Sequence, residues 1–286
     1  MKLIGVRIPG TDHNRIAITE VGNKVRVLTT LEDFWADPTR WLENAPADGQ
    51  LLSTGDVHII PPVLPDAKVI CIGLNYRAHA AEGTYKDHEL PPHPTLFARW
   101  TQSLSVDGHP APVPANEAGL DWEGEIAAYV GQTLVDADAE TARQAVMGYS
   151  IFNDLTSRIA QKLTSQWILG KNGDNSGPLG ALVTADEVGD LRDGLRVQTR
   201  VNGTTVQDGN TKDMIYDLGE TLSLISQTFT LRPGDIVCTG TPEGVGYARN
   251  PQWLLQPGDV VEVEGDKLGV LTTPIVANDY RHGSTR

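Results

Sequence analysis

Three acidic residues in the middle of this 286-residue chain could together hold a divalent metal ion. Glu123 and Glu125 flank one glycine in the run LDWEGEIAAYVG, so on a strand both side chains point to the same face. Asp154 ends a second strand-like run, GYSIFND. If the carboxylates converge, each close pair repels by about 4 kcal/mol at an effective dielectric constant of roughly 20, so the cluster needs a cation. Oxygen ligands without cysteine favour Mg²⁺ or Mn²⁺, and Ca²⁺ could bind the same ligands in vitro.

Each of these acids also has an ordinary structural interpretation. A Glu-x-Glu pair by itself is more typical of a solvated strand face, and an Asp before a helix is commonly its N-cap. The apolar residues that follow Glu125 favour a strand that enters the core instead. The metal-site hypothesis therefore depends on whether the three side chains meet.

A second pair of residues could move a proton. His79 and Glu82 lie three positions apart in NYRAHAAE, so in a helix their side chains can touch. A carboxylate beside an imidazole fixes its tautomer and stabilises the imidazolium, which suits a general base. The same spacing on an exposed helix would give only a surface pair.

Several cations and one turn could bind an anionic substrate. Lys171 precedes the loop NGDNSGPLG, Arg99 closes PTLFAR, and Arg158 follows Asp154 by four positions. The loop TGTPEGVG offers the Thr241 hydroxyl and backbone amides, although a plain glycine-rich turn would look the same. The phosphate-loop, GxSxG and CxxC patterns are absent from the sequence, which argues against a P-loop nucleotide site, a serine hydrolase and a zinc site.

Composition narrows the class of protein further. The net charge of −14 argues against nucleic-acid binding, which depends on clustered Lys and Arg. The two cysteines, Cys71 and Cys238, sit in apolar runs and provide no disulfide framework. The N-terminus lacks a signal-like apolar segment and no run is long enough to span a membrane, so we expect a cytoplasmic protein.

The elements that must position these residues divide into two parts. Residues 1–64 predict a small α/β module, with three short strands, a helix over 31–45 that is interrupted at Pro38, and a proline-rich linker at 59–66. Residues 65–286 predict a mainly β, mostly antiparallel body with a few helices. We expect strands over 68–74, 94–99, 120–131, 148–154, 232–237 and 256–261, a hairpin turn at Asn202-Gly203, and helices over 137–148, 157–170 and 213–229.

Eight segments in order between residues 68 and 276 resemble the fumarylacetoacetate hydrolase superfamily. They are GLNYRAHAAE, PTLFAR, LDWEGEIAAYVG, GYSIFNDLTSRIAQ, QWILGK, VNGTTVQDGNTKDMI, PGDIVCTGTPEGVG and PGDVVEVEGDKLG. The resemblance implies a distorted β-roll, usually in a homodimer, with one Mg²⁺ or Mn²⁺ per subunit held by Glu123, Glu125 and Asp154.

The resemblance also implies roles for the other candidates. It makes His79 and Glu82 an acid–base dyad on a lid, makes Lys171 catalytic, and places Arg99, Arg158, Gln161 and Thr241 in the substrate pocket. This sequence departs from the family where Lys171 is followed by NGDN without an aromatic residue and where Trp100 follows Arg99. We expect both departures to touch the pocket wall.

The predicted activity is metal-dependent hydrolysis of a C–C bond in a small acylpyruvate-like substrate, a 2,4-dioxo acid or other 1,3-dicarbonyl compound of the kind met in aromatic catabolism. Oxaloacetate decarboxylation and isomerisation of a hydroxymuconate-type compound are the alternatives on the same fold, since both need an enolate but no attacking water. A non-catalytic metal- or ligand-binding protein is the remaining alternative, and fold alone does not separate these functions.

Overall fold

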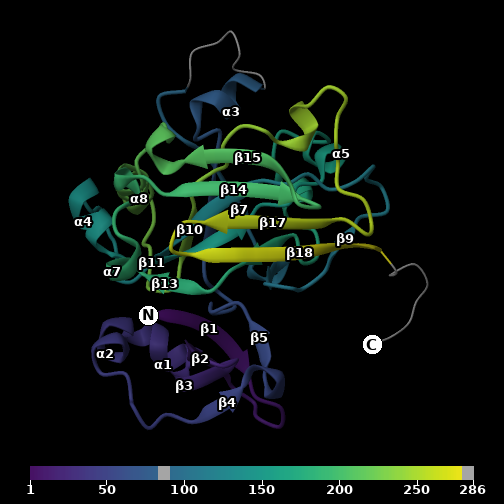
Figure 1. Cartoon of the computed structure of the whole chain (residues 1–286). Coiled ribbons are helices and arrows are strands. Elements are labelled where there is room, and N and C mark those ends of the chain that lie inside the picture. Colours follow the sequence, from purple (N-terminus) through teal and green to yellow (C-terminus); the bar gives the residue numbers. More distant parts are fainter. Residues whose placement is uncertain (83–90, 279–286) are drawn as a thin grey trace.

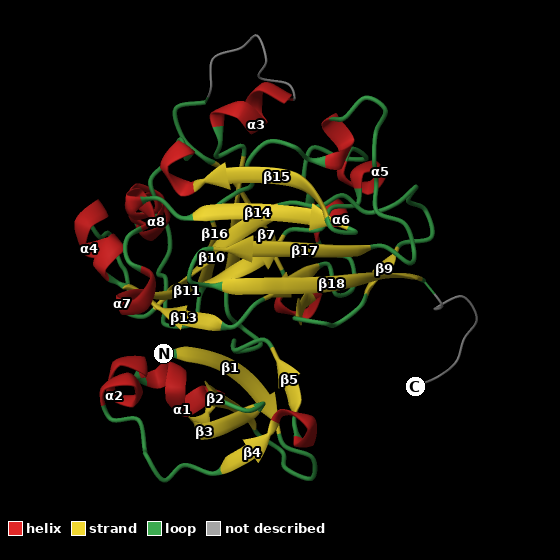
Figure 2. Ribbon diagram, in the orientation of Figure 1, coloured by secondary structure: helices red, strands yellow, loops and turns green. Residues whose placement is uncertain are grey.

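Two β-sheets carry the fold of the computed structural model, which describes residues 1–82 and 91–278 (Figure 1). Within these residues the larger sheet has 13 strands and runs β4-β3-β2-β1-β13-β11-β10-β16-β6-β7, with β5, β8 and β12 paired beside this path. The smaller sheet has five strands in the order β15-β14-β17-β18-β9. Figure 2 shows that helices sit at the edges and ends of these sheets.

The strands of the larger sheet are β1 (Lys2–Arg7), β2 (Asn14–Glu20), β3 (Lys24–Thr30), β4 (Leu51–Ser53), β5 (His58–Ile60), β6 (Val69–Gly73), β7 (Thr95–Arg99), β8 (Leu104–Val106), β10 (Gly124–Val130), β11 (Val146–Asn153), β12 (Gly177–Leu179), β13 (Leu182–Thr184) and β16 (Ile236–Cys238). Those of the smaller sheet are β9 (Ala111–Val113), β14 (Arg196–Val201), β15 (Thr204–Asn210), β17 (Val260–Gly265) and β18 (Gly269–Ala277). The helices are α1 (Leu31–Ala36), α2 (Pro38–Glu43), α3 (Arg77–Glu82), α4 (Ala139–Gln144), α5 (Arg158–Gln161), α6 (Ile168–Lys171), α7 (Ala185–Val188) and α8 (Leu218–Ser226).

Strand β10 is the centre of the molecule. All seven of its residues are buried, because its apolar side chains meet other side chains on both faces. It pairs antiparallel with β11 on one side and β16 on the other, and its first residue, Gly124, lies opposite Asn153 at the end of β11. This register places the start of one strand beside the end of the next.

The smaller sheet packs on the face of β10 and β11. Ile126 of β10 shares one apolar cluster with Val197 of β14 and Val263 of β17. Gly124 lies so close to this sheet that a Cβ there would come within 2.3 Å of the Thr199 hydroxyl oxygen. A glycine between the two glutamates therefore lets the sheets meet at the candidate metal site.

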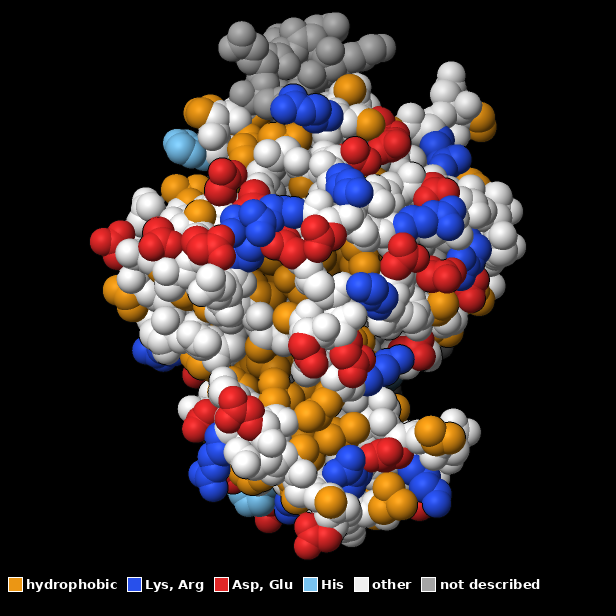
Figure 3. All heavy atoms as spheres, turned by 60° about the vertical axis from the view of Figure 1, so that its left-hand side comes forward, with side chains coloured by type: hydrophobic (Ala, Val, Ile, Leu, Met, Phe, Trp, Pro, Cys, Tyr) orange, Lys and Arg blue, Asp and Glu red, His pale blue; other side chains and the backbone are white. Residues whose placement is uncertain are grey.

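The N-terminal module joins the larger sheet instead of standing apart from it. Strand β1 pairs with β13, and one apolar cluster contains both Phe34 of the module and Phe152 of β11. Trp35 stacks on Tyr129 of β10 with the ring centroids 6.2 Å apart, and its indole donates to the Pro62 carbonyl oxygen. Apolar side chains gather at this junction in Figure 3. The division at residue 64 stays a prediction, but the core continues across it.

The predicted strands and helices are found, but the strands expected over 120–131, 232–237 and 256–261 begin later, at Gly124, Ile236 and Val260, and three helices are shorter than predicted. The predicted helix over 157–170 forms only its two ends, α5 and α6. The helix over 137–148 stops at Gln144, because Val146 already belongs to β11. The helix over 213–229 begins at Leu218, where the Asp217 side chain accepts hydrogen bonds from two first-turn amides.

Other expectations are confirmed. The hairpin turn has positive φ at both Asn202 (49°) and Gly203 (79°), as a type I′ turn requires. The helix over 31–45 is divided at Pro38, which is the first residue of α2. Among the described helices, none has the length and apolarity to cross a bilayer.

Replacing Trp35 by Ala should destabilise the whole molecule, because the ring fills the junction between the module and β10. Loss of a buried Trp costs about 3–5 kcal/mol in the free energy of unfolding. Trp100→Ala is the matched control, since that side chain is 56% exposed and should change stability by less than about 0.5 kcal/mol. Urea unfolding followed by circular dichroism measures both, and equal small losses would contradict a shared core.

Candidate active site

The three predicted carboxylates meet. Glu123, Glu125 and Asp154 are 6%, 1% and 0% exposed, and one ligand oxygen from each lies within 4.8 Å of the others. The antiparallel register of β10 and β11 brings them together, since Asp154 follows directly after the residue that pairs with Gly124. Asp154 does not cap the next helix, whose N-cap is Ser157.

Lys171 lies between two of these carboxylates. Its Nζ is 2.6 Å from both Glu123 Oε2 and Asp154 Oδ2, and the side chain is almost fully buried. Burial by itself lowers the pKa of Lys171, but the Asp154 and Glu123 charges outweigh it and raise that pKa, so the ammonium stays charged. Lys171 belongs to the site and not to the solvated surface.

The electrostatics of the two glutamates differ. Burial by itself raises the pKa of Glu123, but the Lys171 and Arg158 charges outweigh it and lower that pKa to about 2. Burial and the neighbouring Asp154 instead raise the pKa of Glu125 well above its usual value, although Gly240 donates a backbone hydrogen bond to this carboxylate at 3.0 Å. The negative charge around Glu125 is thus not fully compensated by the protein. Three hard oxygen donors with excess negative charge fit a divalent cation such as Mg²⁺ or Mn²⁺.

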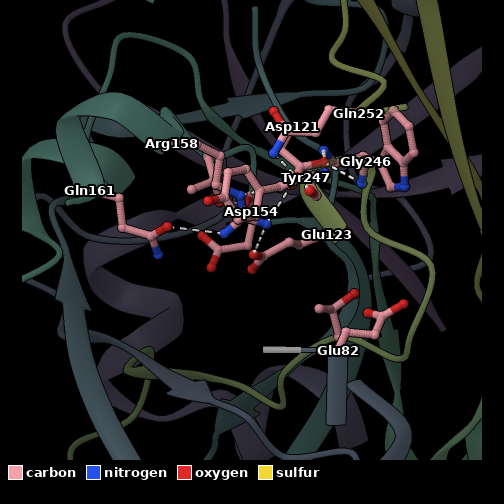
Figure 4. Close-up of polar contacts among 12 residues, drawn as sticks. Glu82, Asp121, Glu123, Asp154, Arg158, Gln161, Gly246, Tyr247 and Gln252 are labelled. Atoms are coloured by element: carbon pink, nitrogen blue, oxygen red, sulfur yellow. Dashed lines mark hydrogen bonds and ion pairs between the residues drawn. The ribbon is translucent and has the colours of Figure 1, made fainter. Parts of the chain in front are cut away.

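Arg158 is held by two carboxylates at the edge of this cluster (Figure 4). Its guanidinium lies 2.7 Å from Glu123 Oε1 and 2.6 Å from Asp121 Oδ2, and it donates to Gln161 Oε1 at 3.1 Å. Opposite charges on both sides raise the pKa of Arg158 despite its burial. Arg158 and Gln161, which the family resemblance placed in the substrate pocket, therefore enter the site together from α5.

Asp121 organises this corner, and the sequence analysis gave it no role. Its side chain accepts backbone hydrogen bonds from Trp122 (2.9 Å), Gly246 (2.7 Å) and Tyr247 (3.1 Å), besides its contact with Arg158. A Cβ at Gly246 would come within 1.9 Å of the Trp253 carbonyl oxygen, so only glycine fits this turn. In the sequence DWEGE, strand alternation places Asp121 on the same face as Glu123, so the sequence pattern could have predicted that Asp121 lies near the site.

The predicted dyad forms on α3. His79 Nδ1 lies 3.1 Å from Glu82 Oε2, with the side chains 13% and 24% exposed. Glu82 Oε1 also accepts a hydrogen bond from the Gly244 amide at 2.8 Å, which ties α3 to the TGTPEGVG loop. The remainder of the predicted lid, at residues 83–90, lies outside the described residues.

These groups surround a cavity of about 210 Å³. Its polar walls are formed by His79, Glu82, Glu123, Glu125, Arg158, Gln161, Lys162, Lys171 and Thr241. Its apolar and backbone walls are formed by Ile72, Gly73, Leu74, Phe97, Trp167, Val245, Tyr247 and Ala248. The dyad and two of the three candidate metal ligands thus face one space.

Arg99 does not line this cavity, contrary to what a substrate-binding residue should do. Its side chain is fully buried behind Asp154, to which its Nε donates, and its other nitrogens donate to Ser176 Oγ at 2.9 Å and the Leu155 carbonyl oxygen at 2.8 Å. Arg99 orients a candidate metal ligand instead. Trp100 and residues 172–175 are also absent from the lining, and the Trp100 amide donates to Asn172 Oδ1 at 2.7 Å. The expectation that both departures touch the pocket wall is wrong.

Thr241 lines the cavity, but its hydroxyl is already engaged. The hydroxyl donates to the Gly124 carbonyl oxygen at 2.9 Å and accepts from Gln207 Nε2 at 2.9 Å. The side-chain oxygen Gln207 Oε1 accepts from the Gly124 amide (3.0 Å) and the Thr199 hydroxyl (2.8 Å). Gln207, which the sequence analysis missed, therefore connects the smaller sheet to the backbone between the two glutamates.

Comparison with known proteins agrees with this geometry. The model of the family described as "Fumarylacetoacetate (FAA) hydrolase C-terminal" matches residues 68–276. The chain belongs to the fumarylacetoacetate hydrolase family. This confirms the resemblance drawn from the eight segments, and the mainly β fold predicted with it is confirmed by the sheets described above.

Relatives within the fumarylacetoacetate hydrolase family carry out more than one reaction. The chain is 39% identical to the 2,4-didehydro-3-deoxy-L-rhamnonate hydrolase of Sphingomonas sp. (strain SKA58), over 81% of this chain and 80% of that protein. It is 37% identical to the mitochondrial oxaloacetate tautomerase fahd2 of Xenopus laevis, over 79% and 70% of the two chains. A solved structure of a putative HpcE protein from Mycobacterium smegmatis superposes with a TM-score of 0.84 at 30% identity, covering 98% of this chain and all of that one.

Replacing Asp121 by Asn should destabilise the protein. Every hydrogen bond to the Asp121 carboxylate is donated by the other group, and the amide nitrogen of Asn cannot accept one. We expect a loss of about 3 kcal/mol in the free energy of unfolding, the lower range for breaking a buried pair, since Arg158 keeps Glu123. The matched control is Asp208→Asn. Asp208 and its partner Arg196 are both about half exposed, so this substitution should lower the free energy of unfolding by less than about 1 kcal/mol. Urea unfolding compares them, and equal losses would argue against the organising role of Asp121.

Proposed function

We propose that this protein is a divalent-metal-dependent hydrolase that cleaves a C–C bond in an acylpyruvate-like 2,4-dioxo acid. The single observation that carries the proposal is that a His–Glu dyad and a buried carboxylate cluster face the same cavity. A dyad of this kind suits the activation of water, which hydrolysis needs. The carboxylates suit a cation that polarises a dicarbonyl compound.

The proposed metal ligands are Glu123, Glu125 and Asp154, with Mg²⁺ or Mn²⁺ as the ion. When bound, such an ion supplies positive charge to substrate oxygens as a Lewis acid and orients the substrate. Arg99 and Lys171 help to orient two of these ligands through their contacts with Asp154 and Glu123.

The residues of the chain then supply the proton transfers. Because His79 Nδ1 faces Glu82, its Nε2 is the nitrogen left to take a proton from water as the oxygen attacks C4 of the substrate. The C3–C4 bond breaks, its electron pair moves to C3 and onto the C2 oxygen as a pyruvate enolate, and a proton returns to C3. The acyl part leaves as a carboxylic acid. Lys171 and Arg158 stabilise negative charge that develops on oxygen.

The relatives support the reaction class and also the main alternative. The name of the Sphingomonas hydrolase describes a substrate with oxo groups at C2 and C4, which is the pattern proposed here. The Xenopus relative favours oxaloacetate tautomerisation or decarboxylation as the second candidate, because these reactions use the same kind of enolate without an attacking water. A hydroxymuconate-type isomerisation belongs with this second candidate. A small-molecule substrate, a homodimer and a cytoplasmic location stay predictions.

Removal of the metal should abolish activity, and Mg²⁺ or Mn²⁺ should restore it. Glu125→Ala should weaken metal binding by at least about 100-fold, since even loss of an outer partner of a ligand costs about 10- to 100-fold. The control is Glu264→Ala, an acidic residue on the adjacent sheet that is 48% exposed. Calorimetric titration of the metal-stripped proteins measures affinity without turnover. Full activity in chelator-treated enzyme would refute the metal assignment.

Replacing His79 by Ala should separate hydrolysis from the enolate-only reactions. Loss of a general base costs about 100- to 10,000-fold, so hydrolysis of acylpyruvates should fall by that factor. Oxaloacetate decarboxylation should fall much less, because the carboxylate cluster is intact. Product analysis by mass spectrometry, with metal content checked, follows both reactions.

The control for this experiment is the exposed His109→Ala, which should leave both rates unchanged. If His79→Ala keeps acylpyruvate hydrolysis within a few-fold of the unaltered protein, the water-activating role is wrong. If the unaltered protein hydrolyses no acylpyruvate but converts oxaloacetate rapidly, the second candidate replaces the first.

A further inference from the structure

Three cations line the active-site cavity, and one of them differs from the other two. Arg158 contacts Glu123 and Asp121, and Lys171 contacts Glu123 and Asp154. Lys162 lines the same cavity but contacts no carboxylate among the residues that the structure describes. Within residues 1–82 and 91–278, its positive charge is therefore the one of these three that pairs with no anion.

The ammonium of Lys162 is nevertheless held in place. It lies 3.7 Å from the centroid of the Tyr247 ring, and it donates a hydrogen bond to the Tyr247 hydroxyl. The Tyr247 backbone is in turn fixed by its hydrogen bond to Asp121. Contact with the ring restricts the long Lys162 side chain, so less conformational entropy remains to be lost when the ammonium binds an anion.

The position of Lys162 along the cavity wall follows from its neighbours. Arg158 contacts Glu123 at the carboxylate cluster, and its guanidinium carbon lies 5.9 Å from the centroid of the Tyr247 ring. Lys162 contacts the same ring, so the wall runs from Glu123 through Arg158 and Tyr247 to Lys162 (Figure 4 shows the first three). Unlike Arg158 and Lys171, Lys162 has no contact with Glu123, Glu125 or Asp154, so it lies farther from the proposed reaction centre than they do.

Apolar groups form the rest of the space that such a tail would cross. Phe97 and Trp167 line the cavity with their rings packed edge to face at 5.3 Å, and Ile72 and Leu74 lie beside them in the lining. A Cβ at Gly73 would come within 2.5 Å of the Trp167 ring, so this wall is closely packed. The cavity therefore combines apolar walls with a cation, Lys162, that pairs with no carboxylate among the described residues.

We infer that Lys162 is a specificity-determining residue that binds a carboxylate at the far end of the substrate tail. The substrate class is then an acylpyruvate with a short hydrocarbon tail that ends in a carboxylate, in preference to one with a neutral tail. This inference rests on the proposed function, which supplies the 2,4-dioxo acid head.

The test compares two substrates that differ only in the distal charge: succinylpyruvate, and the same compound with the distal carboxylate as a primary amide. The unaltered protein should favour the diacid by about tenfold in kcat/KM, the range for a partly exposed charged hydrogen bond. Lys162→Met should reduce kcat/KM for the diacid by about tenfold, mostly through KM, and leave the amide within about threefold. Lys162→Arg should restore the preference, and Lys24→Met, an exposed lysine on β3, is the control.

A binding experiment keeps the subsite separate from the reaction. Calorimetry on the Mg²⁺-loaded protein with 2-oxopimelate and its distal amide, which lack the C4 oxo group, measures the same preference without turnover. A preference for the diacid that Lys162→Met removes would support the subsite even if neither succinylpyruvate compound were hydrolysed, and that outcome would overturn only the hydrolase proposal. Equal binding of the two analogues, or a preference that survives Lys162→Met, would overturn the subsite.

Discussion

Three carboxylates converge in the buried centre of this molecule, and the structure around them is organised by their mutual repulsion. Glu123, Glu125 and Asp154 are withdrawn from water, where their charges would be solvated at little cost. Cations from two separate helices partly neutralise these charges: Lys171 is the last residue of α6, and Arg158 is the first residue of α5. These cations lower the pKa of Glu123, whereas burial and Asp154 raise the pKa of Glu125, and three convergent oxygen donors fit a divalent ion.

The surrounding contacts explain how such a cluster stays in place. Two of the three carboxylates, Asp154 and Glu123, are held by side chains that have further partners of their own. Arg99 holds Asp154 from behind, and Asp121 holds Arg158, which contacts Glu123. Gln207 reaches from the smaller sheet to the backbone between the glutamates and uses all of its hydrogen-bonding capacity there. The strand register sets the site, and these partners limit its freedom to rearrange.

In the proposed binding mode, one cavity holds both the dicarbonyl head and the tail of the substrate. At the head, buried charges and the dyad on α3 surround the place where a dicarbonyl group would bind. Lys162, which the proposal assigns to the tail, is exposed and contacts the Tyr247 ring. In the proposed binding mode, chemistry shared within the fumarylacetoacetate hydrolase family belongs to the head, whereas Lys162 discriminates between tails. This division is consistent with relatives that act on different compounds.

The sequence by itself determined the mainly β class, the family, the three carboxylates and the dyad. These signals are local: alternation placed Glu123 and Glu125 on one face, and a three-residue spacing joined His79 to Glu82. Only the tertiary structure decided that Arg99 lies behind Asp154, that the helix over 157–170 forms only at its two ends, and that Asp121 and Gln207 support the site. Each of these depends on contacts between residues far apart in the chain, such as Arg99 with Asp154 and Gln207 with Thr241. Side-chain type and spacing cannot show whether a cation will line the cavity or contact a metal-binding carboxylate from the side away from the cavity. Sheet packing decides which side of each residue is open.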